Sequence, residues 1–168
     1  LRILLEAGLE GIHGYVAQLG EVKEKYKYAL EIAAGNRLGQ IVVDNDNVAS
    51  KAIDILKRKK AGRLTFLPLN RLKRKLNHEP TKRFEKGNNE PGYIDKAIHL
   101  IDFESVYTNV FQYVFGETRV FTDLESAKIT KMNTRIVTLS GELLETSGAI
   151  TGGSRLNRDL AFQFGLNT

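Results

Sequence analysis

The sequence of 168 residues contains no cysteine and no tryptophan, and it has only one methionine, three prolines and three histidines. Without cysteine the chain cannot form disulfides, offer a thiol nucleophile or bind a metal through thiolates, and a reducing, intracellular compartment suits it. His13, His78 and His99 lie in separate segments, without the close spacing of a metal-binding pair. The sequence therefore predicts neither a metal site nor a cofactor in this chain.

Long apolar runs are also missing. No stretch reaches the roughly 18 apolar residues that a membrane-spanning helix needs, and Arg2 and Glu6 interrupt the apolar N-terminus. We therefore expect no signal peptide and no membrane partner. The sequence has no Gly-rich phosphate-binding loop, and Ser140 and Ser154 have no histidine in a motif that would activate them. It thus predicts no catalytic residue within this chain.

The charge that is present is unevenly distributed. Hydrophobic residues make up 42% and charged residues 27% of a globular composition, and 25 basic against 20 acidic residues give a net charge of +5. Between positions 57 and 75 there is no acidic residue but nine basic ones: Lys57, Arg58, Lys59, Lys60, Arg63, Arg71, Lys73, Arg74 and Lys75. The first four suit the C-terminal end of a helix. Together with Arg71, Lys73, Arg74 and Lys75 they also suit a surface that binds nucleic-acid phosphates.

One order of elements occurs twice along the sequence. In the first copy, residues 14–19 alternate as a strand does, residues 23–34 read as an amphipathic helix stopped at Gly35, and residues 41–43 read as a buried strand. A polar run from position 44 to 47 then supplies an N-cap for a second helix that ends near residue 60. Residues 63–67 follow as a strand closed by Pro68.

The second copy repeats these landmarks in the same order. Residues 92–94 match residues 14–16, and residues 107–115 read as a helix that ends at Gly116. A strand at 120–121, a shorter helix at 123–131 and a strand at 135–139, matched with 63–67, complete it. Alternating strands and helices predict a mixed α/β fold. The repeated order predicts two similar α/β subdomains related by internal duplication.

Two segments stand apart from the repeat. Residues 70–91 contain two of the three prolines and read as an exposed, basic linker. Near the C-terminus, Gly148, Gly152 and Gly153 fall within six residues of a strand-like stretch. Such glycines are typical either of a flexible loop or of a strand that another backbone approaches closely.

These residues resemble the hinge domain of the structural maintenance of chromosomes (SMC) proteins, in particular the prokaryotic, homodimeric branch. The similarity covers residues 9–155. Its most specific motifs are Gly-Arg-Leu-Thr-Phe-Leu-Pro-Leu at residues 62–69 and Thr-Gly-Gly-Ser at residues 151–154.

The resemblance implies a dimerisation module of a chromosome-organising ATPase. Hinges of this family pair into a ring-shaped homodimer and join their sheets through a glycine-rich edge, which in this chain corresponds to Gly148, Ala149, Ile150, Thr151, Gly152 and Gly153. It also implies a cytoplasmic, nucleoid-associated protein that binds DNA weakly and without sequence preference. The ATPase heads lie outside this chain, at the far end of a coiled coil, and accessory condensin-type subunits bind elsewhere in the full-length protein.

The implied organisation has five parts. Residues 1–8 end an incoming coiled-coil arm, residues 9–69 form hinge subdomain I, residues 70–91 form the basic linker, residues 92–154 form hinge subdomain II, and residues 155–168 lead to a returning arm. The alternative is a stand-alone basic α/β domain that binds nucleic acid or regulates another protein, in which the glycines belong to a loop.

Overall fold

The computed structural model describes residues 1–72, 90–154 and 162–167. In chain order, with η marking a 3-10 helix, the elements are α1 (Arg2–Glu6), β1 (Ile12–Tyr15), η1 (Val16–Gln18), β2 (Gly20–Val22), α2 (Glu24–Ala34), η2 (Gly35–Gly39), β3 (Ile41–Val43), α3 (Asp46–Lys59), β4 (Phe66–Pro68), β5 (Tyr93–Lys96), η3 (Ala97–Leu100), β6 (Ile101–Phe103), η4 (Ser105–Tyr107), α4 (Thr108–Phe115), β7 (Arg119–Phe121), α5 (Leu124–Ile129), β8 (Ile136–Thr138), β9 (Leu143–Leu144), β10 (Ile150–Thr151) and β11 (Gly165–Leu166).

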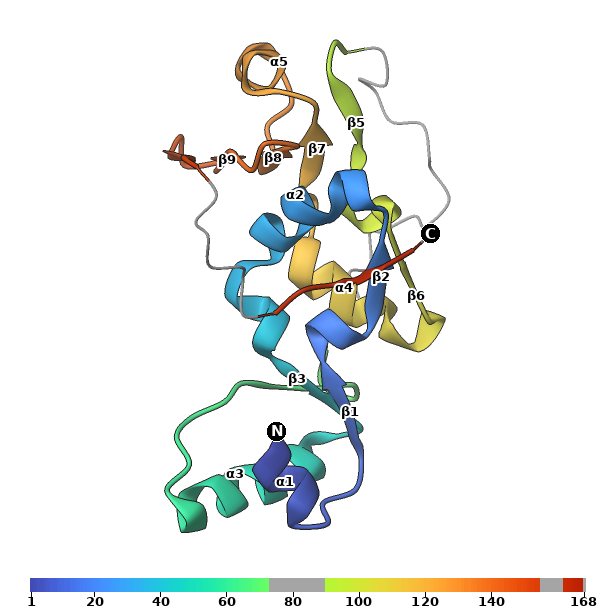
Figure 1. The fold of residues 1–168 in the computed structure, drawn as a ribbon, viewed down its shortest axis with the longest axis vertical. Helices are drawn as coiled ribbons and strands as arrows, with labels where there is room; N and C mark the ends of the chain where they lie inside the picture. The colour runs from blue at the N-terminus through green and yellow to red at the C-terminus, as the bar shows by residue number, and fades with distance from the viewer. Residues whose placement is uncertain (73–89, 155–161, 168) are drawn as a thin grey trace.

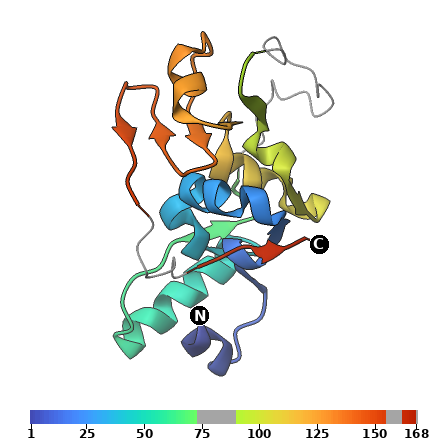
Figure 2. The ribbon, with the colours of Figure 1, turned by 45° about the horizontal axis from the view of Figure 1, so that its top comes forward.

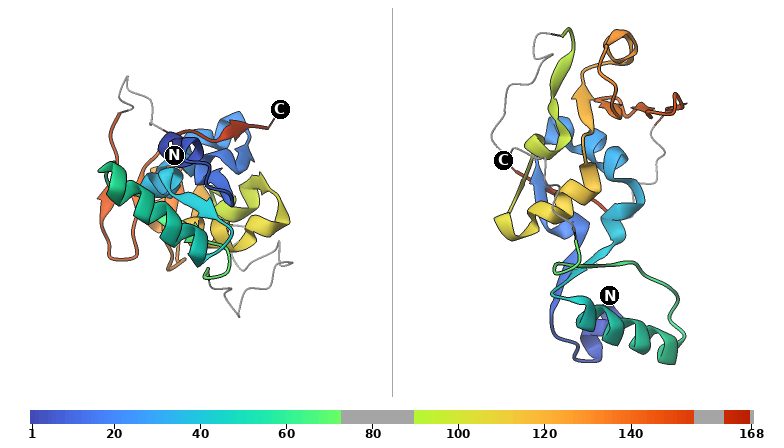
Figure 3. Two further views of the ribbon diagram at one scale, coloured as in Figure 1. Left: turned by 90° about the horizontal axis from the view of Figure 1, so that it is seen from below. Right: turned by 180° about the vertical axis from the view of Figure 1, so that it is seen from behind.

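The strands form three sheets, with the orders β1-β3-β4, β10-β9-β8-β7-β5 and β11-β2-β6. Figure 1 shows an elongated molecule with α1 and α3 at one end, α5 at the other, and α2 and α4 between them. The view from behind in Figure 3 shows the same succession. The predicted mixed α/β fold is therefore confirmed.

The two halves repeat one connectivity. In the first half, β1 is antiparallel to β3 and β3 is parallel to β4; in the second, β5 is antiparallel to β7 and β7 is parallel to β8. Both antiparallel pairs contain a register shift. The helices α2 and α4 both end at a glycine of nearly the same conformation, Gly35 with φ 56° and Gly116 with φ 53°. The helices α3 and α5 both begin at a side-chain cap, on Asn45 and Asp123 respectively.

The residue matching predicted for the repeat is wrong at two places. The amide of Asp44 donates to the carbonyl of Gly11, as that of Thr122 does to Gly92, so Gly92 corresponds to Gly11 and not to Gly14. Gly11 and Gly14 lie close together in the first copy, and the sequence alone favoured Gly14 as the counterpart of Gly92.

The last strand of each half was also matched two residues out of register. The amide of Ile41 donates to the carbonyl of Thr65, and the amide of Arg119 donates to that of Arg135. Thr65, and not Arg63, is therefore the counterpart of Arg135. With the first correction, the same offset separates Gly11 from Gly92 and Gly35 from Gly116.

Two predicted strands differ in extent. Residues 14–19 do not form one strand, because the side chain of Gln18 turns back and accepts a hydrogen bond from the amide of Tyr15, and a 3-10 turn separates β1 from β2. The strand predicted from residue 63 begins only at Phe66, and it includes Pro68. A proline inside a strand is compatible with a sheet edge, because its missing amide does not leave a neighbouring strand unpaired.

The halves meet where β2 pairs with β6. Glu21 lies opposite Asp102, Gly20 opposite Phe103 and Val22 opposite Ile101. Since β2 and β6 are equivalent strands and run antiparallel, this pairing is what a local two-fold axis between the halves produces.

Three hydrophobic cores follow from this arrangement. The central core draws on both halves, among others through Val22, Leu30, Val42, Leu67, Val110, Phe111, Val120 and Val137. One outer core joins α1 and α3 to the first sheet through Leu4, Ile41, Val43, Ala52 and Leu56. The other joins α5 to the five-stranded sheet through Phe121, Ala127 and Ile136.

Strand alternation assigns side chains to these cores. Val42 faces the central core, while its neighbours Ile41 and Val43 face the outer one. In the second half, Val120 faces inward and Phe121 faces α5. The helices α2 and α4 therefore share one core, so the halves are not independent hydrophobic units. The subdomain limits proposed from the sequence remain a prediction.

A substitution in the central core tests this sharing. Phe111 is 0% exposed and stacks on Phe103 with ring centroids 4.6 Å apart. Phe111→Ala is expected to lower the free energy of unfolding by about 3–5 kcal/mol, because it removes buried contacts and leaves a cavity. The loss should shift one cooperative denaturation curve, measured both by far-UV circular dichroism and by tyrosine fluorescence.

The matched control is Val106→Ala, since Val106 lies in the same half and is 54% exposed. We expect this variant to stay within about 0.5 kcal/mol of the wild type. Two resolved transitions in Phe111→Ala, with only the second half destabilised, would contradict a shared core.

Candidate dimer edge and nucleic-acid surface

The glycine-rich segment predicted as the dimer edge contains an edge strand. β10 pairs antiparallel with β9, Ile150 opposite Leu144 and Thr151 opposite Leu143, and it is the last strand on its side of the five-stranded sheet. Figure 2 shows this hairpin at the side of the molecule, away from α2 and α4. Gly148, Ala149, Ile150, Thr151, Gly152 and Gly153 are all exposed.

Backbone groups of β10 point away from the hairpin. The amide of Glu145 donates to the carbonyl of Ala149 at 2.9 Å, which makes these two a hydrogen-bonded pair. In an antiparallel ladder such pairs alternate with non-bonded ones, so Ile150 turns its amide and carbonyl outward. Its side chain is 55% exposed. An unpaired strand edge with an apolar side chain is a template for another strand.

The presence of glycine at these three positions can also be explained within a single chain. Gly148 closes the β9–β10 turn with φ 101°, and Gly153 has φ 149°, conformations that a residue with a Cβ rarely adopts. Gly152 has no such φ, but a Cβ there would lie 3.1 Å from Cγ of Glu142. Backbone conformation thus accounts for two of the three glycines. Only Gly152 bears directly on how closely a partner strand could approach.

A second sheet edge is free in the first half. β4 has β3 as its only neighbour in the described part of its sheet. The carbonyl of Thr65 and the amide of Leu69 both bond to β3. By alternation, the amide and carbonyl of Phe66 therefore point away from β3. In the second half, β9 covers the corresponding side of β8.

The basic residues predicted to bind nucleic acid fall into separate places. Lys57, Arg58, Lys59 and Lys60, here called the basic cluster, are exposed at the C-terminal end of α3. Lys60 ends the helix in the left-handed conformation, with φ 51°. Cations at this position complement the helix dipole, so the structure accommodates both roles considered from the sequence.

Arg71 does not join the basic cluster. It lies at the opposite end of α3, where its Nε and a terminal nitrogen bond Asp46 at 2.8 and 2.7 Å. Arg58 follows Asp46 by twelve positions along the helix, a rise of roughly 18 Å. Arg71 therefore lies apart from the basic cluster, bound to a carboxylate in the first turn of α3, and its predicted contact with nucleic acid remains a prediction. Lys73, Arg74 and Lys75 lie outside the described residues.

Two carboxylates at the starts of helices have lowered pKa values. Hydrogen bonds from Arg71 and then Asn70 hold the pKa of Asp46 below its usual value. The backbone amide of Ser126, followed by the hydroxyl of Thr122, does the same for Asp123 at the start of α5. Hydrogen bonds that stabilise the ionised carboxylate cause both shifts.

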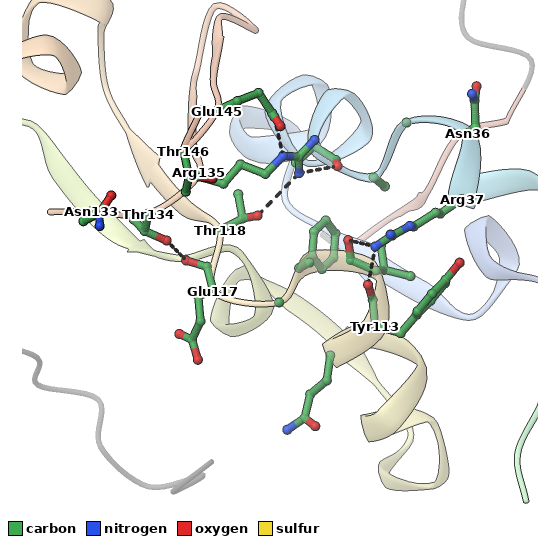
Figure 4. Close-up of a pocket in the computed structure, with 17 residues that line it drawn as sticks. Asn36, Arg37, Tyr113, Glu117, Thr118, Asn133, Thr134, Arg135, Glu145 and Thr146 are labelled. Atoms are coloured by element: carbon green, nitrogen blue, oxygen red, sulfur yellow. Dashed lines mark hydrogen bonds and ion pairs between the residues drawn. The ribbon is translucent and has the colours of Figure 1, made fainter. Parts of the chain in front are cut away.

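A cleft of about 850 Å³ lies between the halves where α2 and α4 end. Figure 4 shows arginines that cross it in opposite directions. Arg37, just after α2, donates to the carbonyl of Tyr113 at the end of α4. Arg135, just before β8, donates to the carbonyl of Ala33 in α2 at 2.8 Å and forms an ion pair with Glu145 at 2.7 Å. Each half thus caps a helix of the other, which no sequence motif had indicated.

Two kinds of site do not occur in the described parts of the chain. Residues 1–72, 90–154 and 162–167 bring together no group of three histidine or acidic side chains that could hold a metal ion. Within the same residues, no helix combines the length and apolarity needed to cross a membrane.

Comparison with known proteins identifies the fold. The family described as "SMC proteins Flexible Hinge Domain" matches residues 9–130. The chain belongs to the SMC hinge family. Chromosome partition protein Smc from Synechococcus is 51% identical over 98% of the chain, and that from Synechocystis is 47% identical over 98%. The chain spans 13% of the length of each of these two relatives.

Solved SMC hinge structures agree with this assignment. The hinge domain of the Pyrococcus furiosus SMC protein has a TM-score of 0.76 and 38% identity, and the match covers 95% of this chain and 82% of that one. An asymmetric dimer of the Geobacillus stearothermophilus SMC hinge domain gives a TM-score of 0.76 at 32% identity, covering 89% of this chain and 62% of that one. The hinge assignment made from the sequence is thus confirmed.

The ion pair at the start of α3 predicts a pH dependence for this hinge. Arg71→Ala is expected to raise the pKa of Asp46 toward its ordinary value. A carboxyl whose folded-state pKa is lowered stabilises the fold above its unfolded pKa, and that stability is lost as the pH falls through the folded pKa. The melting temperature of the wild type should therefore fall more steeply than that of Arg71→Ala from about pH 5 to about pH 3.

Titration of the Asp46 carboxyl by NMR measures the effect directly. Arg58→Ala is the control, because it removes the same charge at the other end of α3. An Asp46 that titrates identically in Arg71→Ala and in the wild type would refute the assigned cause.

Proposed function

We propose that this chain is the dimerisation hinge of a chromosome-partitioning SMC protein and that β10 pairs with a strand of a second copy. The observation that carries the proposal is the exposed β10 edge, with the outward backbone groups of Ile150. Support also comes from the Geobacillus stearothermophilus hinge, whose solved structure is described as a dimer.

The partner strand that fits this edge best is β4 of the second copy. β4 offers the outward amide and carbonyl of Phe66, and it belongs to the half in which no described strand corresponds to β9. In a two-fold dimer, the β10-to-β4 contact would occur twice, which pairs the β10 and β4 edges of both chains and closes the assembly. A stable contact of this kind buries on the order of 1,600 Å² in total.

We further propose that the basic cluster binds DNA weakly, through phosphates and without sequence preference. Its four cations are exposed and none of the described ion pairs involves them. Phosphate contacts position a protein on nucleic acid without reading its sequence. A dimer would offer two such clusters and thereby strengthen binding.

The relatives extend far beyond this chain, and the rest of the proposal concerns that larger protein. ATPase heads and the sites of accessory subunits would lie outside the hinge, which itself requires no cofactor. A cytoplasmic, nucleoid-associated location agrees with the names of the relatives, which are chromosome partition proteins.

A lysine on the edge strand tests the dimer. Ile150→Lys is expected to weaken dimerisation at least 10-fold, because a charged edge strand resists burial against another strand. Light scattering over a dilution series should give twice 18.8 kDa for the wild type and a mass near 18.8 kDa for the variant at the same concentration. Thr65→Lys, beside β4, should weaken the dimer similarly.

The control is Ile129→Lys, the same substitution at an isoleucine that is 72% exposed on the second half, in α5. It should leave the mass unchanged. An unaltered dimer in Ile150→Lys would overturn the β10 contact, and loss of the dimer in Ile150→Lys but not in Thr65→Lys would overturn β4 as its partner. A wild type that remains a monomer at all concentrations would favour the stand-alone domain.

Neutralising the basic cluster tests DNA binding. The triple variant Lys57→Gln, Arg58→Gln and Lys59→Gln should bind single-stranded DNA more weakly and release about three fewer counterions. The slope of log affinity against log salt should therefore become shallower by about 2, at roughly 0.7 per phosphate contact. Fluorescence anisotropy with a labelled oligonucleotide at several salt concentrations measures both quantities.

A second triple variant, Lys23→Gln, Lys25→Gln and Lys131→Gln, removes the same charge from exposed positions elsewhere. Equal losses in the two variants would mean that net charge, and not the basic cluster, determines the affinity. Glutamine is chosen over glutamate so that no negative charge is placed at the C-terminal end of α3.

A further inference from the structure

The residues Phe162–Asn167, here called the C-terminal strap, lie across the junction of the two halves. Their strand β11 runs parallel to β2, with Gly165 opposite Glu21 and Leu166 opposite Val22. Since β2 also pairs with β6, the strap extends the very sheet that joins the halves. Figure 1 shows it crossing over β2 and α4.

An aromatic side chain anchors the strap in the central core. Phe164 is buried, with its ring centroid 6.4 Å from that of Phe111 and 6.2 Å from that of Phe115, both on α4. At the start of the strap, Phe162 packs on Tyr15 with centroids 4.7 Å apart. Phe162 also fills the space at Gly39, where a Cβ would lie 2.6 Å from its ring.

Hydrogen bonds to polar groups of both halves also hold the strap in place. The amide of Phe164 donates to Glu31 of α2 at 2.8 Å, and Glu31 is only 3% exposed. At the other end, the amide of Asn167 donates to the carbonyl of Val22 at 2.7 Å, and its side chain donates to Asp102 of β6. A buried carboxylate that loses a donor is costly, so partial release of the strap is disfavoured.

From these contacts we infer that the C-terminal strap is a latch with a seated and a released state, and that its seating holds the two halves together. Seated, it contributes a strand, a core aromatic and hydrogen bonds to α2 and β6. Released, it leaves the aromatic residues of α4 uncovered and β2 with β6 as its only neighbour. Because the two equilibria are linked, a force or ligand that displaces the strap weakens the β2–β6 junction. Conversely, a force or ligand that weakens this junction favours release of the strap. The inference does not depend on dimerisation or on DNA binding.

Hydrogen exchange on the intact chain tests the latch. Phe164→Ala is expected to speed amide exchange in β2 and β6 by about 10-fold or more relative to the wild type, with little change in α3, which belongs to a different core. Val106→Ala is the control, since Val106 is 54% exposed and lies outside the strap. Unchanged exchange in β2 and β6, or equal acceleration in α3, would overturn the latch.

A charge exchange provides a second test that spares the core. Asn167→Asp places a carboxylate against Asp102 and should speed exchange in β2 and β6. Adding Asp102→Asn restores a donor and an acceptor in swapped positions, so the double variant should recover wild-type exchange. Failure of the single variant to speed exchange, or of the double variant to restore it, would show that this end of the strap does not hold the junction.

Discussion

The three residue pairs in which β2 meets β6 are the constraint on which the rest of this hinge depends. They bring equivalent strands of the two halves into one sheet, and this places α2 and α4 side by side over a common core. Each half therefore buries one face of its own sheet in a core to which the other half also contributes side chains. The outer faces are covered by α1 and α3 at one end and by α5 at the other, so the molecule is long and has a small core at each end.

This division leaves the sheet edges exposed. Helices pack on the outer faces of two of the sheets, but no described strand pairs with the outer side of β10 or of β4. The two edges differ in character, since β10 follows a glycine turn and β4 contains Pro68. A proline limits which backbone groups an edge can offer, so register at such an edge is constrained by the few groups that remain. The β9–β10 hairpin therefore combines a glycine turn at Gly148 with an exposed strand edge at β10.

The sequence predicted the class of fold, the order of elements and the family, because these depend on local signals. Gly35 and Gly116 mark helix ends, and the caps at Asn45 and Asp123 mark helix starts, all within a few residues. It failed where a choice depends on distant partners. Gly11 and Gly14 are equally good candidates until the hydrogen bond to Asp44 is known, and the partner of Arg71 is a carboxylate that lies 25 positions earlier. The glycine-rich segment around β10 was predicted from a sequence motif. Two of its glycines, Gly148 and Gly153, are nevertheless explained by the backbone conformation within one chain.

The crossed arginines have an evolutionary consequence. Arg37 satisfies carbonyls at the end of α4, and Arg135 satisfies a carbonyl of α2, although these residues are not counterparts in the repeat. A chain that arose from two identical units would have needed the same cap on both sides. Here each half has a different cap, supplied from a different element. The halves have specialised for each other, so neither can be replaced by a second copy of its sibling without leaving helix carbonyls uncapped between them.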